Sequence, residues 1–244
     1  MEHCMDEIYG INEFDALLVT DMQKDFLPGG ALPVENGDLI IPVINNYIKR
    51  FVAAKAHIIA SRDWHPENHI SFKGRGGPWP AHCVQQTEGA EFNPKMRFPS
   101  GTIIISKATD PEKEAYSVFD ETNFDQELRM LNIKRLFIGG IATDYCVLNT
   151  VIDARKLDYE AVVLTDATLG INVNKGDVER AFELMFKMGA QQANSSDFPD
   201  SVDSLPIEKL KADELAEKPA TRALVKKKAR MRPRGSAKRL PTEQ

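Results

Sequence analysis

Three side chains that can perform nucleophilic catalysis follow apolar runs in this sequence. Asp21 comes directly after the run ALLVT, Lys107 ends TIIISK, and Cys146 follows RLFIGG. Desolvation beside a buried apolar run raises the pKa of a carboxyl group, as a general base requires. A lysine at the end of a buried strand needs a carboxylate partner or an anionic substrate. The three residues therefore predict a cysteine nucleophile served by a buried acid and a buried cation.

The stretch GGIATDYCVLNT, residues 139–150, predicts a tight turn that leads into a helix. Thr143 or Asp144 could cap that helix and place Cys146 in its first turn. The positive end of the helix dipole would then lower the pKa of the thiol. Unbonded amides at the helix start, from Ala142 to Cys146, could form an oxyanion hole.

Taken alone, each of these residues also fits an ordinary structural role. Asp21 could cap a loop or a helix, Lys107 could extend its ammonium to the surface, and Cys146 could be a buried, unreactive thiol. Only their occurrence together at strand ends favours catalysis over these alternatives.

A carboxylate and three imidazoles lie close together in the loop that follows the second apolar run. They are Asp63, His65, His69 and His82. Nitrogen and oxygen ligands of this kind suit zinc, iron or manganese better than calcium or magnesium. The alternative is a set of solvated loop histidines. The sequence therefore predicts a metal site in this loop.

The elements that must position these residues alternate along the chain between short apolar runs and helical patterns. Strands are expected at 16–21, 56–63, 102–107, 135–140 and 161–167, with an edge strand within 190–197, and helices at 39–54, 124–131, 146–157 and 176–188. Continuous apolar strands between helices are typical of a parallel sheet covered on both faces. The pattern predicts a doubly wound, three-layer α/β/α domain over roughly residues 12–200.

Ligands of open α/β sheets bind outside the carboxyl ends of the strands. Asp21, Asp63 and Lys107 end the first three expected strands, Cys146 follows the fourth, and Asp166 lies near the end of the fifth. The long loop over residues 64–100 adds the histidines, and long loops are often functional. We therefore expect one site at this edge of the sheet.

Charge divides the chain of 244 residues into an acidic body and a basic tail. Residues 218–244 carry a net charge of +9, and the remaining residues carry −14. We expect one catalytic domain within residues 1–200 and an extension over 201–244 whose tail, from about 218, is solvated and disordered. The alternative is that the tail binds nucleic acid or an anionic surface, or serves as a nuclear address.

Cysteine usage and hydropathy suggest where the protein works. Three widely spaced cysteines, no secretory signal and no long apolar run predict a cytoplasmic protein with free thiols and no membrane span. The sequence is compatible with a monomer and with a homo-oligomer.

Five segments together resemble the nicotinamidase (pyrazinamidase) group of the isochorismatase-like cysteine hydrolases, from about Asp15 to Asp197. In chain order these segments are DMQKDFLPGGALPV, SRDWHPENHISF, WPAHCVQQTEGAEF, SKATDPEKEAYSVF and GIATDYCV. The resemblance implies a catalytic triad at Asp21, Lys107 and Cys146. It also implies a cis peptide bond between Ile141 and Ala142.

The same resemblance assigns the other site residues and the reaction. The implied metal ligands are Asp63, His65, His69 and His82, and the implied substrate pocket consists of Phe26, Trp79, Tyr116 and Tyr145. Zinc is the expected ion, with iron or manganese as alternatives. The implied reaction is hydrolysis of nicotinamide to nicotinate and ammonia in NAD salvage. The alternative is a related amidohydrolase that acts on another small amide or carbamoyl compound.

Overall fold

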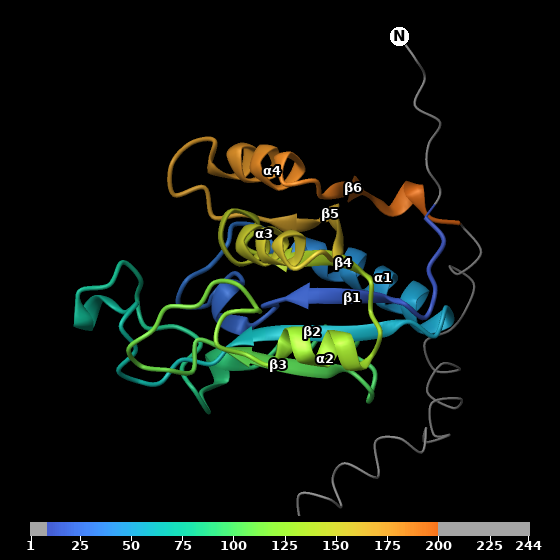
Figure 1. Cartoon of the computed structure of the whole chain (residues 1–244). Coiled ribbons are helices and arrows are strands. Elements are labelled where there is room, and N and C mark those ends of the chain that lie inside the picture. Colours follow the sequence, from blue (N-terminus) through green and yellow to red (C-terminus); the bar gives the residue numbers. More distant parts are fainter. Residues whose placement is uncertain (1–8, 200–244) are drawn as a thin grey trace, which may run out of the picture.

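The computed structural model describes residues 9–199 as a three-layer α/β/α domain (Figure 1). The basic tail and the expected boundary near residue 200 lie outside the described residues. Within the described residues, no helix is long and apolar enough to cross a membrane.

A six-stranded sheet forms the middle layer. Its strands are β1 (Asp15–Thr20), β2 (His57–Asp63), β3 (Ile103–Lys107), β4 (Arg135–Ile141), β5 (Glu160–Leu169) and β6 (Gln191–Ala193), in the order β3-β2-β1-β4-β5-β6. All neighbouring pairs are parallel. Every residue of β1 is buried, as a central strand covered on both faces requires. The expected doubly wound parallel fold is therefore confirmed.

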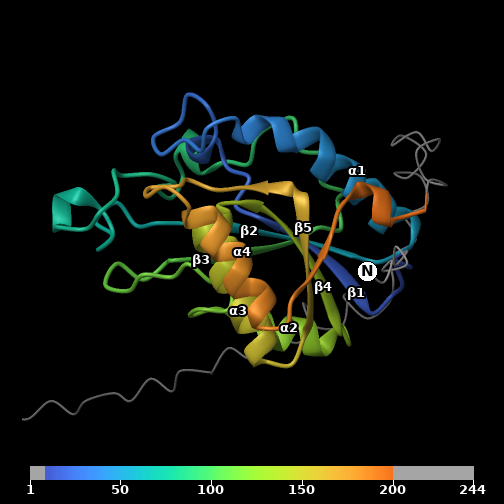
Figure 2. The same ribbon diagram turned by 90° about the horizontal axis from the view of Figure 1, so that it is seen from above.

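Helices cover both faces of the sheet (Figure 2). α1 (Ile41–Ala53) packs on one face, where Ile44, Tyr47 and Phe51 join the core with Leu17 and Phe137. The other face carries α2 (Phe124–Met130), α3 (Leu148–Lys156) and α4 (Asp177–Lys187). Each of these helices has a buried apolar stripe against the sheet and a polar outer side.

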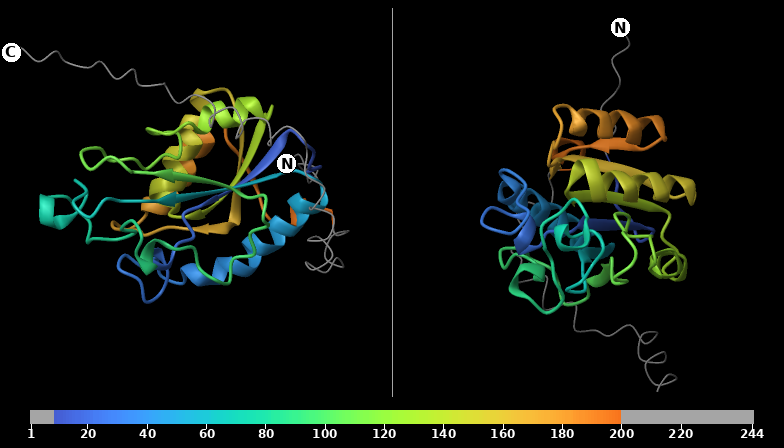
Figure 3. Two further views of the ribbon diagram at one scale, coloured as in Figure 1. Left: turned by 90° about the horizontal axis from the view of Figure 1, so that it is seen from below. Right: turned by 90° about the vertical axis from the view of Figure 1, so that its left-hand side faces the viewer.

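The strand order reverses direction between β1 and β4, the neighbouring pair at the centre of the sheet. Chains that leave such a pair turn to opposite sides and open a crevice at the carboxyl ends. Asp21 follows β1 and Cys146 comes shortly after β4, so both border this crevice. The loops that follow β2 and β3 gather at the same end of the sheet (Figure 3).

Two local expectations are wrong. The turn after β4 is a π-helical turn, Thr143–Val147, and no side chain caps it. β5 continues beyond Asp166, whose carboxylate accepts hydrogen bonds from Tyr47 (2.8 Å) and from the Ser195 amide (2.9 Å). Asp166 therefore connects α1 and the segment after β6 and does not belong to the crevice.

Candidate active site

Lys107 lies at the centre of a buried charged cluster at the carboxyl end of the sheet. Its ammonium lies 3.0 Å from Asp21 Oδ2 and 3.4 Å from Cys146 Sγ, and it also donates to Asp63 Oδ1. All four residues are at most 5% exposed. The structure thus brings the predicted triad together and joins it directly to a predicted metal ligand.

Strand register explains why the carboxylates meet the lysine. β2 and β3 pair in parallel with Asp63 opposite Lys107, and β1 lies on the other side of β2. Ser61, two residues before Asp63 on β2, donates its hydroxyl to Asp21 Oδ1 at 2.7 Å. Asp21 itself has a φ of 50°, a left-handed conformation that aspartate tolerates better than most residues.

Burial and ion pairing set the charges of this cluster. Burial raises the pKa of Asp21, and Lys107 only partly opposes the shift. Burial alone would lower the pKa of Lys107, but the carboxylates of Asp21 and Asp63 raise it well above its usual value. The lysine is therefore a permanent cation, while Asp21 is a carboxyl group with a raised affinity for protons, as the sequence predicted.

The expected low pKa of the Cys146 thiol is wrong for this arrangement. Burial raises the pKa of Cys146 well above its usual value, and the nearby Lys107 ammonium does not compensate. Complete desolvation disfavours the thiolate more than one cation and a single irregular turn favour it. The thiol is therefore protonated at rest and needs a base to become a nucleophile.

We call residues 141–147, which lead from β4 to Cys146, the nucleophile turn. It has the cis peptide bond between Ile141 and Ala142 that the resemblance implied. The Ala142 carbonyl accepts from the amides of Tyr145 and Val147, each at 3.1 Å. Ala142 and Cys146 both line the pocket. An oxyanion hole formed by their amides stays a prediction.

Three of the four predicted metal ligands come together. Asp63, His65 and His82 are buried, and their ligand atoms lie within 4.8 Å of one another. His82 Nδ1 lies 2.8 Å from the Pro80 carbonyl, so it carries the proton and leaves the lone pair on Nε2. Both ring nitrogens of His65 are buried without a hydrogen-bond partner. A divalent metal ion fits this donor set and would provide the partner that the His65 ring lacks.

His69 lies beside these ligands but is bonded differently. Its ring centroid is 4.3 Å from that of His65. Nε2 lies 2.8 Å from the Lys113 carbonyl and Nδ1 lies 2.7 Å from the Ser71 hydroxyl. Neither nitrogen therefore offers a lone pair to a metal in this arrangement, and a ligand role for His69 stays a prediction.

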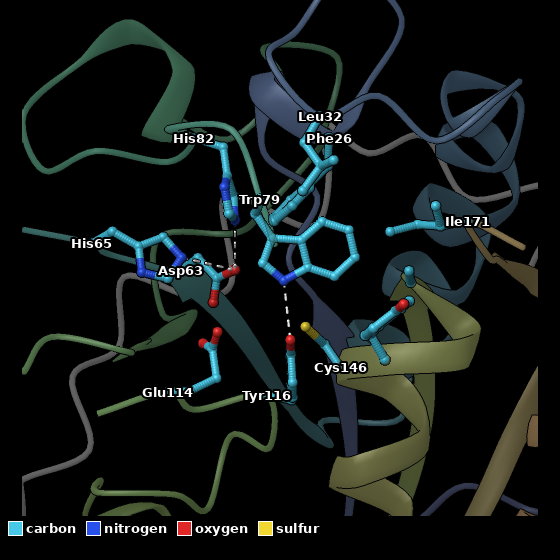
Figure 4. A pocket seen from close by; sticks show the side chains of 12 residues that line it. Phe26, Leu32, Asp63, His65, Trp79, His82, Glu114, Tyr116, Cys146 and Ile171 are labelled. Carbon is cyan, nitrogen blue, oxygen red and sulfur yellow. Dashed lines mark hydrogen bonds and ion pairs between the residues drawn. The ribbon is translucent and has the colours of Figure 1, made fainter. Parts of the chain in front are cut away.

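Aromatic side chains form the wall of a pocket between the metal ligands and Cys146 (Figure 4). Trp79 donates its indole N–H to the Tyr116 hydroxyl at 3.0 Å and meets Tyr145 edge to face at 5.1 Å. Phe26 contacts His82 with ring centroids 5.4 Å apart. Burial raises the pKa of Tyr116 to about 12, so its hydroxyl is neutral. The pocket suits a flat, uncharged ring.

Sequence reasoning missed Gln23 and three residues of the pocket. Gln23 is fully buried, donates to the Asp63 carbonyl at 2.7 Å, and accepts from the Asp63 amide at 2.8 Å, which fixes the backbone of this metal ligand. The position of Gln23 within DMQKDF, two residues after Asp21, was the available signal. Leu32, Glu114 and Ile171 also line the pocket. Leu32 and Glu114 lie within two of the five segments, which was the available signal, whereas Ile171 lies in none of them.

Fold and site together define an α/β enzyme of the cysteine hydrolase class. The chain belongs to the isochorismatase domain family, which matches residues 15–197. It is similar to the nicotinamidase of Escherichia coli (strain K12), with 36% identity over 207 residues that cover 76% of this chain and 97% of that protein. The family expected from the five segments is therefore confirmed.

Solved structures agree with this assignment. The chain resembles the pyrazinamidase of Pyrococcus horikoshii in complex with zinc, with 53% identity, a TM-score of 0.71, and coverage of 74% of this chain and 98% of that one. It also resembles PnC1 from L. infantum in complex with nicotinate, with 32% identity, a TM-score of 0.73, and coverage of 78% and 98%.

Proposed function

We propose that this protein hydrolyses nicotinamide to nicotinate and ammonia. The observation that carries the proposal is one pocket lined by Cys146, by the Asp63, His65 and His82 ligands, and by aromatic rings. The similar proteins named nicotinamidase and pyrazinamidase, and the related structure in complex with nicotinate, support the same substrate. We place the reaction in NAD salvage in the cytoplasm.

The first half of the reaction uses Asp21, Lys107 and Cys146. Asp21 takes the thiol proton, and Sγ attacks the carboxamide carbon. The amides of Ala142 and Cys146 hold the negative charge that develops on the carbonyl oxygen. When the tetrahedral adduct collapses, its C–N bond breaks, Asp21 returns the proton to the leaving nitrogen, and ammonia leaves a thioester.

The second half of the reaction restores the enzyme. Asp21, again unprotonated, accepts a proton from water, and the hydroxyl oxygen adds to the thioester carbon. The C–S bond then breaks, and Cys146 recovers its proton from Asp21. The product leaves as nicotinic acid, which loses its remaining proton to water and becomes nicotinate. Lys107 stays charged throughout and offsets the negative charge that moves between Asp21 and the sulfur.

Asp63, His65 and His82 would hold the metal ion, and we propose zinc. Such an ion would supply a Lewis acid for the nitrogen of a pyridine ring and would thereby help to orient the ring. Asp63 also accepts from Lys107, so a single carboxylate links the metal ligands to the catalytic cluster. Phe26 and Trp79 would enclose the ring and exclude water from it.

Replacing His65 by alanine is expected to lower bound metal at least about tenfold, because this side chain is a direct ligand in the proposal. Elemental analysis of the purified protein measures the effect. His69→Ala is the matched comparison, since both nitrogens of His69 already have hydrogen-bond partners. Metal retained in His69→Ala but lost in His65→Ala supports a three-residue site. Equal loss in both variants would support four ligands, and full retention in His65→Ala would contradict the site.

Pyrazinamide is expected to be hydrolysed as well, because its ring keeps a nitrogen in the position that matches nicotinamide. Ammonia release from nicotinamide, pyrazinamide, benzamide and an N-carbamoyl amino acid, with and without chelator, measures the preference. Benzamide, which lacks the ring nitrogen, is expected to react at least about 100-fold more slowly in kcat/KM. Preference for the carbamoyl compound would instead support the alternative amidohydrolase.

A further inference from the structure

The carboxylate of Asp144 joins the nucleophile turn to the segment that follows β5. Asp144 lies in the π-helical turn two residues before Cys146. Its Oδ1 accepts from the Ile171 amide at 2.9 Å, and its Oδ2 accepts from the Asn172 amide at 2.8 Å. Both oxygens of one side chain therefore hold two consecutive amides of a distant segment, instead of capping their own helix.

The two segments touch closely at this point. A Cβ atom added at Gly170 would lie 2.7 Å from Asp144 Oδ1 and 2.2 Å from Val178, closer than side chains tolerate. A second bond connects the turn to the end of β5, directly before this segment, because the hydroxyls of Thr143 and Thr168 lie 2.8 Å apart in the buried core. The segment after β5 is thus attached to the nucleophile turn by hydrogen bonds.

This segment contributes Ile171 to the pocket. Ile171 lines the pocket with Cys146 and packs against the apolar core. Figure 4 shows it on the opposite side of the pocket from His65 and His82. If the nitrogen of a substrate ring faces the histidines, the opposite edge of the ring contacts Ile171. This apolar side chain then limits movement of the ring away from the metal ligands.

We propose that Asp144 is a positioning residue that sets the far wall of the substrate pocket by fixing Ile171 relative to Cys146. This inference rests on the proposed function, which supplies the substrate: a flat heteroaromatic amide. Asp144 touches neither the substrate nor the reacting atoms in this arrangement, and acts through the two amides that it binds. Its contribution is to substrate binding and not to the chemical step.

Four variants test the proposal: Asp144→Asn, Ile171→Ala, the double variant, and Asp177→Asn as a control. Asparagine keeps one acceptor but turns an NH₂ group toward an amide that needs an acceptor. Each of the first two changes is expected to raise KM for nicotinamide about tenfold while kcat changes less than about threefold. The double variant is expected to match the worse single variant, because both changes remove the same wall.

Asp177 is a matched control because its carboxylate accepts from the Asn174 amide at 2.7 Å, in the same segment but away from the pocket. Asp177→Asn is expected to leave KM unchanged. Additive losses in the double variant, or an equal rise of KM in the control, would overturn the role of Asp144. So would a fall in kcat and in thermal stability without a change in KM.

Hydrogen exchange provides a measurement that does not depend on turnover. The amides of Ile171 and Asn172 are expected to exchange at least about tenfold faster in Asp144→Asn than in the unmodified protein, because their acceptors are lost or weakened. Unchanged exchange overturns the proposal whatever the substrate is. An unmodified protein that leaves nicotinamide intact would instead refute the proposed function, and the exchange result would still decide the role of Asp144.

Discussion

Replacing Cys146 by alanine is expected to abolish ammonia release from nicotinamide, with kcat lowered at least about 10⁴-fold. The variant loses the sulfur that forms the thioester, and no other thiol among the described residues lines the pocket. Loss of one buried sulfur leaves the remaining apolar contacts of the turn in place, so the fold is expected to persist. Ammonia release and thermal unfolding are the two measurements.

Cys83 is the matched control, because it is the other buried free cysteine within residues 9–199 and directly follows His82. Burial raises the pKa of Cys83 well above its usual value too, so depth alone does not distinguish the two thiols. Of the two cysteines that the structure describes, Cys146 is the one whose sulfur lies within hydrogen-bond distance of the Lys107 ammonium, at 3.4 Å. Cys83→Ala is expected to keep kcat within about threefold. Retained turnover in Cys146→Ala would remove the nucleophile assignment.

Most of the fold could be predicted from the sequence because a parallel sheet has a strong local signature. The runs ALLV in β1 and AVVL in β5 are apolar throughout, and strands buried on both faces have this pattern. The position of the site followed from the same strands, since their carboxyl ends share one edge of the sheet. Asp21, Lys107 and Cys146 could therefore be grouped without knowing any distance.

What could not be predicted depends on contacts between distant residues. Asp144 has the residue type and position of a helix cap, yet its carboxylate binds amides 27 and 28 residues further along the chain. His69 has the type and spacing of a ligand, yet one nitrogen lies within hydrogen-bond distance of a carbonyl 44 residues away. Spacing reveals which side chains are near a site, but not which partner each one binds.

The protonation state of Cys146 also could not be predicted from the sequence. A thiol at a helix start suggested a lowered pKa, but the structure buries that thiol beside two carboxylates. Desolvation acts on a fully buried group with a magnitude that a single turn of backbone dipoles cannot match. The depth of a residue in the folded protein therefore decided the sign of the shift.

Replacing Lys107 by methionine is expected to abolish activity and to lower the free energy of unfolding by about 3–5 kcal/mol. Methionine has a similar length, so packing changes little, but Asp21 and Asp63 lose the cation that both contact. Breaking a buried ion cluster leaves uncompensated charge in a medium that cannot solvate it. Urea unfolding measures the loss, with chelator in every sample so that metal binding adds no stability.

Lys24 provides the matched control, because it also pairs with two carboxylates, Glu88 at 3.0 Å and Glu91 at 2.9 Å, but on the surface. Lys24→Met is expected to leave unfolding and activity almost unchanged, since water screens exposed pairs. A similar loss of stability in both variants would mean that burial does not decide the strength of the Lys107 cluster.

Adding Asp21→Asn to Lys107→Met separates charge from packing. If uncompensated charge causes the instability, removal of one carboxylate is expected to recover about 1–3 kcal/mol. If lost packing causes it, the second change recovers nothing. Turnover is expected to stay absent in either case. Burial raises the pKa of the Cys146 thiol, and the double variant lacks Asp21, the base that must deprotonate it. Recovered stability without recovered turnover would show that uncompensated charge, and not lost packing, destabilises Lys107→Met, and that catalysis needs more than a stable cluster.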